Sequence, residues 1–199
     1  MPEHIRRHYD ALIEQDNDPV CDPPELKSYM DLWDGDAFIA QMQLTKEKSV
    51  LEIGVGTGRL ALRVIPLCGY FCGIDLSEKT IARAREHLPE GAQLICGNFL
   101  THAFSQTFDV IHSSLTFMHI RDKQAAVEKI AGLLRENGRF VLSIDKNQAT
   151  MIDAGFSRIA VYPDNSGEML RYIECAGLCV EKQYETELAH IFACRRGIS

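Results

Sequence analysis

Two periodicities of apolar residues alternate along the chain from residue 49 onward. Short, almost entirely apolar runs of strand length come first, and segments whose apolar residues recur at helical spacing follow them. A continuous apolar run is typical of a strand that is buried on both faces, as in a parallel sheet covered by helices. The predicted strands span residues 50–53, 70–75, 93–96, 108–113 and 139–144. The pattern therefore predicts an α/β fold with a doubly wound sheet.

The last part of the chain departs from this alternation. Residues 147–166 show no regular period, and we expect them to be irregular and to form a second wall of a substrate pocket. A helix is predicted over residues 167–176, ended by Gly177. Residues 179–186 and 190–195 alternate apolar and polar side chains weakly, which predicts a terminal antiparallel pair.

Residues 1–48 differ from the alternating region and are interpreted as an N-terminal helical arm. A short amphipathic helix is followed by proline-containing breaks, and one long helix is then predicted over residues 25–44. The arm either lies over a ligand site as a lid or packs as helices on the edge of the sheet. In the first case, its aromatic side chains are candidates for a substrate pocket: Tyr9, Tyr29 and Trp33.

The first predicted strand runs directly into a glycine-rich turn over residues 54–58, Gly-Val-Gly-Thr-Gly. Alternating glycines permit backbone angles that a Cβ atom disfavours, and they let a ligand lie against bare backbone. A helix after such a turn directs free N–H groups and the positive end of its dipole into the same space. The stretch therefore indicates a cradle for a nucleotide-type ligand.

A carboxylate closes the second predicted strand, since the run 70–75 ends in Asp75. At the carboxyl end of a strand in a doubly wound sheet, this side chain can accept hydrogen bonds from both hydroxyls of an adenosine ribose. Ser77 stands where it can cap a helix over residues 78–87. We therefore predict that Asp75 binds a ribose.

The glycine turn and the acidic Glu52 two residues before it resemble motif I of the class I S-adenosylmethionine (SAM)-dependent methyltransferases, acidic-x-Gly-x-Gly-x-Gly. Residues 73–77 resemble the second motif of that family, and the opening Phe108-Asp109 of the fourth strand resembles its motif IV. The resemblance covers about residues 49–195. It implies a three-layer, seven-stranded, mostly parallel sheet with a terminal antiparallel strand, and a SAM-binding domain over residues 49–199.

The resemblance also implies roles for individual residues. Glu52 is expected to accept from the ammonium group of SAM, directly or through water. Asn98 stands where the family usually carries Asp, and it keeps an acceptor oxygen for the adenine amino group. Phe99 either flanks the adenine ring or belongs to the core. The expected cofactor-binding residues are Glu52, Gly54, Gly56, Thr57, Gly58, Asp75, Leu76, Asn98, Phe99, Ser113 and Ser114.

The loop after the fourth strand is expected to carry the chemistry, because ligands of open parallel sheets bind at the carboxyl ends of the strands. His119 in this loop is the candidate catalytic residue, either as a general base for a hydroxyl or acid substrate or as a hydrogen-bonding scaffold group. Phe117 is a further candidate for the substrate pocket. Arg59 either meets a ligand carboxylate or faces solvent.

Composition narrows the choice of partner and compartment. The 199 residues carry a formal net charge of -7, which argues against nucleic acid and favours a small-molecule acceptor. The seven cysteines show no Cys-x-x-Cys spacing, so we expect a cytoplasmic protein without a metal site. His4 and His8 are expected at the surface. The start of the chain has no signal-peptide pattern, no run reaches membrane-spanning length, and we expect no membrane partner.

The sequence thus predicts an enzyme that transfers the methyl group of SAM to a small-molecule acceptor and leaves S-adenosylhomocysteine (SAH). A NAD(P)-dependent oxidoreductase is one alternative, because it would share the fold and the ribose carboxylate, although Arg59 stands where its fingerprint has a third glycine. A non-catalytic SAM-binding protein is the other. The accepting atom is oxygen, nitrogen, sulfur or carbon.

Overall fold

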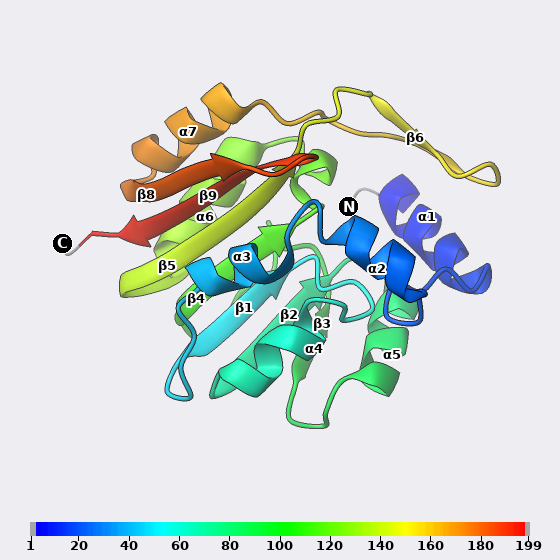
Figure 1. Ribbon diagram of the computed structural model, residues 1–199, viewed down its shortest axis with the longest axis horizontal. Helices are drawn as coiled ribbons and strands as arrows, with labels where there is room; N and C mark the ends of the chain where they lie inside the picture. The colour runs from blue at the N-terminus through cyan, green and yellow to red at the C-terminus, as the bar shows by residue number, and fades with distance from the viewer. Residues whose placement is uncertain (1–2, 198–199) are drawn as a thin grey trace.

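A seven-stranded sheet lies between two layers of helices in the computed structural model, which describes residues 3–197 (Figure 1). The strands of this sheet are β1 (Ser49–Ile53), β2 (Tyr70–Asp75), β3 (Gln93–Cys96), β4 (Phe108–Ser114), β5 (Leu134–Asp145), β8 (Leu178–Glu185) and β9 (Ala189–Arg196). Their order across the sheet is β3-β2-β1-β4-β5-β9-β8. The order reverses between β1 and β4, which is where ligands of doubly wound sheets bind.

Among the strands of this sheet, only β9, the last along the chain, runs antiparallel to the others. Strands β1 to β5 pair in parallel, whereas β9 pairs antiparallel with both β5 and β8. The predicted three-layer, mostly parallel sheet with a terminal antiparallel strand is therefore confirmed.

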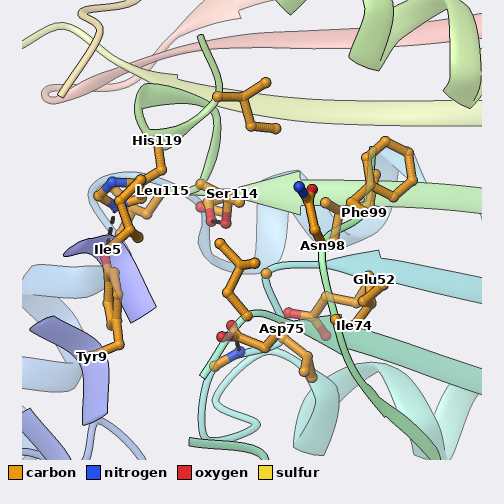
Figure 2. A pocket seen from close by; sticks show the side chains of 18 of the residues that line it. Ile5, Tyr9, Glu52, Ile74, Asp75, Asn98, Phe99, Ser114, Leu115 and His119 are labelled. Carbon is orange, nitrogen blue, oxygen red and sulfur yellow. Dashed lines mark hydrogen bonds between the residues drawn. The ribbon is translucent and has the colours of Figure 1, made fainter. Parts of the chain in front are cut away.

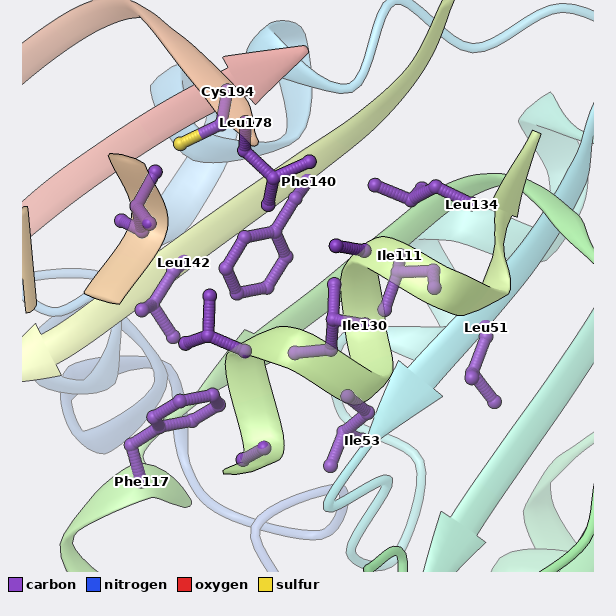
Figure 3. Close-up of a cluster of buried hydrophobic side chains, with 14 of the residues drawn as sticks. Leu51, Ile53, Ile111, Phe117, Ile130, Leu134, Phe140, Leu142, Leu178 and Cys194 are labelled. Atoms are coloured by element: carbon purple, nitrogen blue, oxygen red, sulfur yellow. The ribbon is translucent and has the colours of Figure 1, made fainter. Parts of the chain in front are cut away.

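Each face of the sheet has its own hydrophobic cluster, because neighbouring residues of a strand point to opposite faces. Helices α6 (Lys123–Leu133) and α7 (Ser166–Cys175) cover the face that includes Leu51 and Ile111. Figure 3 shows Phe140, Ile130 and the side chains around them in this cluster. The other face is covered by α3 (Gly35–Gln41), α4 (Ala61–Val64) and α5 (Glu78–His87).

The helices next to the ligand edge begin at capping side chains. Ser77 accepts a hydrogen bond from the backbone N–H of Thr80 at the start of α5, which spans the predicted residues 78–87. Asp122 accepts from the N–H of Ala125 at the start of α6. Such caps satisfy N–H groups that have no partner within the helix.

The N-terminal arm contains three short helices, so the single long helix predicted over residues 25–44 is wrong. The arm folds into α1 (Glu3–Glu14), α2 (Pro24–Met30) and α3. The chain breaks at Asp34 and Gly35, where Gly35 has φ +75° and Asp34 accepts a hydrogen bond from the Gly35 N–H. The left-handed backbone at Gly35 cannot continue a right-handed helix.

A small hairpin extends beside α1, although residues 147–166 were predicted to be irregular (Figure 1). It pairs β6 (Met151–Asp153) with β7 (Arg158–Ala160). Ile159 and Val161 from this segment pack with Ile5 of α1. The hairpin therefore supports the arm on the side away from the sheet.

None of the helices within residues 3–197 combines the length and apolar character needed to cross a membrane.

Candidate active site

A cavity of about 470 Å³ lies at the carboxyl ends of β1 to β4, with α1 along one side (Figure 2). Ile53, Asp75, Gly97 and Ser114 line it where these four strands end. Side chains from α1, the loop before α6 and the segment after β7 complete its wall. The chain thus places this largely apolar cavity at the switch point of the sheet, as the fold rule predicts.

The glycine turn forms the floor of the cavity, and its glycines serve different purposes. Gly54, Gly56 and Gly58 have φ of +78°, +57° and +103°. A Cβ on Gly54 would overlap the side chain of Thr116, and one on Gly58 would press on Leu88, whereas one on Gly56 would meet nothing within 4 Å. The first and third glycines therefore permit close packing, and Gly56 leaves open space for a ligand.

Asp75 is held in place by two backbone donors. The Gly56 N–H donates to Oδ2 of Asp75 at 3.1 Å, and the Ser77 N–H donates to Oδ1 at 3.0 Å. Burial raises the pKa of this carboxyl, and both N–H donors oppose that rise. Each oxygen keeps a lone pair for a ligand hydroxyl.

Glu52 is a buried carboxyl at the deep end of the cavity. Its side chain lines the cavity, is only 3% exposed as a residue, and its Oε2 has no hydrogen-bond partner among the described residues. His112 Nε2 lies 3.8 Å away, but burial lowers the pKa of His112 to about 3, so the ring is neutral. Burial likewise raises the pKa of Glu52 well above its usual range.

Arg59 lines the cavity, but its guanidinium is paired within the protein and is neither turned to solvent nor free for a ligand carboxylate. Its two terminal nitrogens donate to the two oxygens of Asp34, at 3.0 Å and 2.5 Å. Ser114 donates its Oγ–H to Asp34 at 2.8 Å, and the carboxyl of Asp34 is fully buried. Asp34 therefore joins the N-terminal arm to the glycine turn and to the end of β4.

Asn98, Phe99 and Leu76 all border the cavity. The Leu100 N–H donates to Oδ1 of Asn98 at 3.0 Å, so the acceptor oxygen expected to bind adenine already holds the local turn. Phe99 is 6% exposed and belongs to the main hydrophobic cluster, so it serves the core and the cavity wall together.

His119 and Tyr9 meet across the opposite side of the cavity (Figure 2). The Tyr9 hydroxyl lies 2.7 Å from Nε2 of His119, and the two rings pack edge to face. Burial, aided by His8, Lys123 and His4, lowers the pKa of His119 to about 4. The imidazole is therefore neutral near pH 7, and its Nδ1 has no partner among the described residues.

Comparisons with known proteins agree with this geometry. Residues 51–142 match a family described as a methyltransferase domain. An uncharacterized methyltransferase of Bacillus cytotoxicus is 34% identical over 56% of this chain and 58% of the relative. The chain spans a little over half the length of that curated relative.

Solved structures share the fold of this chain at low sequence identity. A putative SAM-dependent methyltransferase of Listeria monocytogenes has a TM-score of 0.76 and 14% identity, covering 87% of this chain and 100% of that chain. The magnesium protoporphyrin IX methyltransferase of Synechocystis PCC 6803 with bound SAM has a TM-score of 0.72 and 13% identity, covering 97% of this chain and 95% of that chain.

Besides Gly58, four residues expected at the site lie outside the cavity wall. Tyr29 is 51% exposed and packs on Trp33, which donates its Nε1–H to Asp145 at 3.2 Å. Phe117 is 1% exposed and belongs to the core cluster. Ser113 is buried and donates its hydroxyl to the carbonyl of Ile53 at 2.8 Å. None of the four side chains borders the cavity, so these expectations are corrected.

The remaining expected residues do line the cavity, whereas Gly58 packs against Leu88 instead. Besides those described above, Thr57 is buried there with a hydroxyl that has no partner among the described residues. Sequence reasoning missed several lining residues because they come from segments with no motif. They are Ile5, Met30, Leu115, Ile120 and Arg121, whereas Tyr162 comes from residues 147–166, the predicted second wall.

One group with metal-ligating atoms exists away from the cavity floor, formed by Asp18, Cys21 and His87. Oδ2 of Asp18 accepts from His87 at 2.7 Å and lies 3.3 Å from a guanidinium nitrogen of Arg83. A cation bound to the same oxygen would be repelled by that guanidinium.

His8, expected at the surface, is instead buried, with Nδ1 2.9 Å from the Ser157 hydroxyl.

Proposed function

We propose that this protein transfers the methyl group of SAM to a small-molecule acceptor and leaves SAH. The observation that carries the proposal is the combination of Glu52, a buried carboxyl without a partner among the described residues, with the open glycine turn and Asp75 around one cavity. A buried carboxyl without a partner is costly, and an ammonium group brought beside it would remove that cost.

The residues present fit the parts of SAM. Glu52 would accept from the ammonium group, and Asp75 would accept from the ribose hydroxyls. Gly56 would let the ligand lie against the turn, because nothing stands within 4 Å of its missing Cβ. The adenine would lie between Leu76 and the segment 98–100, with Ser114 and Thr57 near the methionine portion.

Bound SAM supplies a methyl group on a positively charged sulfur, which a nucleophile can displace in line. The contribution of this chain is to hold both partners and to exclude water. Holding reacting atoms in line can contribute about 7–11 kcal/mol in well-oriented reactions. His119, neutral near pH 7 and fixed by Tyr9, can take a proton from an acceptor hydroxyl.

We propose further that residues 1–48 act as a lid. Asp10 of α1 accepts from the Ser77 hydroxyl at 2.7 Å, and Ile5 and Tyr9 of the same helix line the cavity. A covered cavity of this size favours a small acceptor over nucleic acid or protein. All seven cysteines are free thiols, which supports a reducing, cytoplasmic environment.

Calorimetric titration with SAH tests the cofactor, with NADH as comparator. Wild type should bind SAH and not NADH, and Asp75→Ala should bind SAH roughly 10–100-fold more weakly, because it loses hydrogen bonds to a charged acceptor. Asp153→Ala, on the distant β6, should bind as wild type. Tighter binding of NADH would favour the oxidoreductase alternative.

Catalysis is tested by transfer of labelled methyl from SAM to a panel of small hydroxyl, amine and thiol compounds. Labelled product that Asp75→Ala does not form supports the proposal. SAH binding without transfer to any member of the panel would favour the non-catalytic alternative.

A further inference from the structure

The cavity has two ends of opposite charge. Glu52 and Asp75 lie at the end nearest the glycine turn, and Asp34 behind them is already neutralised by Arg59. At the other end stand Tyr9 and His119, followed along the chain by Arg121 (Figure 2). The acidic end suits the cationic groups of SAM, so the cationic end is left for the acceptor.

Arg121 is the cation in the lining after His119. The adjacent Asp122, which also lines the cavity, accepts from the N–H of Ala125 at the start of α6. The Arg121 side chain is exposed, and within residues 3–197 it forms no hydrogen bond or ion pair. The cations nearby are different: Arg59 is held by Asp34, and Lys123 donates to Asp164 at 2.7 Å and to two carbonyls. Arg121 therefore keeps all five of its N–H donors for a ligand.

Burial keeps the His119 ring neutral at this end of the cavity. His8, Lys123 and His4 each disfavour a proton on the His119 ring, after the effect of burial. The neutral ring also leaves Nδ1 buried without a partner among the described residues. A net charge of -7 makes the chain repel anions as a whole, and a local cation is then needed to hold one.

The surfaces between these polar groups are apolar. Ile5, Leu115 and Ile120 line this part of the cavity, and Tyr162 stands 36% exposed among the lining residues. Lys123 holds the carbonyl of Tyr162 at 2.9 Å, which fixes this aromatic residue relative to Arg121. A ligand here needs an apolar body as well as a charged group.

We propose that the methyl acceptor is an organic acid: an apolar body whose carboxylate pairs with Arg121. This inference rests on the proposed function, since it assigns SAM to the acidic end. A guanidinium matches a carboxylate with two parallel N–H donors, so the pair selects planar acids over neutral compounds of the same shape.

The test compares acids with their uncharged amides in protein saturated with SAH. The probes are 4-hydroxybenzoate, 3-phenylpropionate and octanoate, each titrated beside its carboxamide. At least one acid should bind roughly tenfold or more tightly than its amide, because a hydrogen bond to a charged group is worth more than a neutral one. Added salt should narrow this difference, since Arg121 is exposed.

Two variants with the same change of charge locate the effect. Arg121→Gln should abolish the preference for the acid, whereas Arg171→Gln, on the exposed outer surface of α7, should keep it. SAH should bind both variants as it binds wild type. If all three acids bind no better than their amides, or if Arg121→Gln keeps the preference, the inference is wrong even though SAH binds. Loss of SAH binding by wild type would instead overturn the proposed function.

Discussion

The two ends of the cavity are built in different ways. The end around Asp75 is formed by the glycine turn and by the ends of neighbouring strands. The backbone N–H groups of Gly56 and Ser77 hold the Asp75 carboxylate there. The end around His119 joins α1, the loop after β4 and the segment after β7, which lie far apart in the sequence. The difference suggests a fixed cofactor end and an acceptor end that can change with few substitutions.

The largest expected effect is at the glycine turn. Gly54→Ala should lower the free energy of unfolding by about 2–5 kcal/mol and abolish SAH binding, because φ is +78° and the new methyl would overlap Thr116. Gly56→Ala is the matched control, since its Cβ would enter open space. It should cost only about 1–2 kcal/mol. Denaturant unfolding of both variants measures the difference, and equal losses would contradict the packing role of Gly54.

The link between the arm and the turn gives the next effect. Asp34→Ala leaves the mostly buried guanidinium of Arg59 with only a longer 3.6 Å contact to Asp31, and should lower the free energy of unfolding by about 3 kcal/mol. Arg59→Ala should cost a similar amount. The double variant should lose clearly less than the sum of the two, because both single changes break one ion pair. Additive losses in a double-mutant cycle would show that the pair contributes nothing.

Glu52 sets the pH dependence of the cofactor end. Its pKa in the folded protein is raised by burial, so the folded state holds this proton more tightly than the unfolded chain does. Without ligand, this group therefore lowers stability progressively as pH rises above the usual carboxyl range. Its surroundings are Arg59, which opposes the shift, Asp34 and Asp75, which add to it, and the neutral His112.

Glu52→Gln should therefore have opposite effects on stability and on binding. Melting temperatures measured across pH 5–8 should fall less steeply for the variant than for wild type, while SAH binding weakens roughly tenfold or more. In wild type, SAH should release protons on binding, which calorimetry in buffers of different ionisation enthalpy detects. A variant that binds SAH as tightly as wild type would exclude Glu52 as the ammonium acceptor.

The smallest effect separates two tyrosines of the arm. Tyr9→Phe removes a 2.7 Å hydrogen bond to His119 and should cost about 1 kcal/mol. Tyr29→Phe should change stability by less than about 0.5 kcal/mol, because its side chain is half exposed and its hydroxyl forms no bond among the described residues. Neither change should weaken SAH binding more than slightly. A larger loss for Tyr29→Phe would mean that the arm is organised differently.

The sequence allowed the fold and the place of Asp75 and the glycine turn at one cavity to be predicted, because both depend on neighbouring residues. The spacing of apolar residues indicates which segments are strands and which are helices, and so predicts the layers. The position of Asp75 at the ligand edge follows because it ends β2. Asp34 was missed because its role depends on Arg59 and Ser114, which are 25 and 80 residues away. A local pattern carries no signal of such a contact.

The presence of aromatic residues in the sequence did not by itself show which of them line the cavity near His119. Phe117 and His119 lie two residues apart in one 3-10 turn, whose three residues per turn send them to different sides: one into the core, the other into the cavity. Tyr29 and Trp33 lie on an arm that breaks at Asp34, which changes the face that each presents. Their direction depends on a helix boundary that periodicity did not locate.

Parallel SAH titrations of wild type, Asp75→Ala and Arg121→Gln test the separation of the two ends most directly. The account predicts that SAH binds wild type and Arg121→Gln with the same affinity and that Asp75→Ala loses most of it. Equal weakening in both variants would contradict a cavity divided into a cofactor end and an acceptor end.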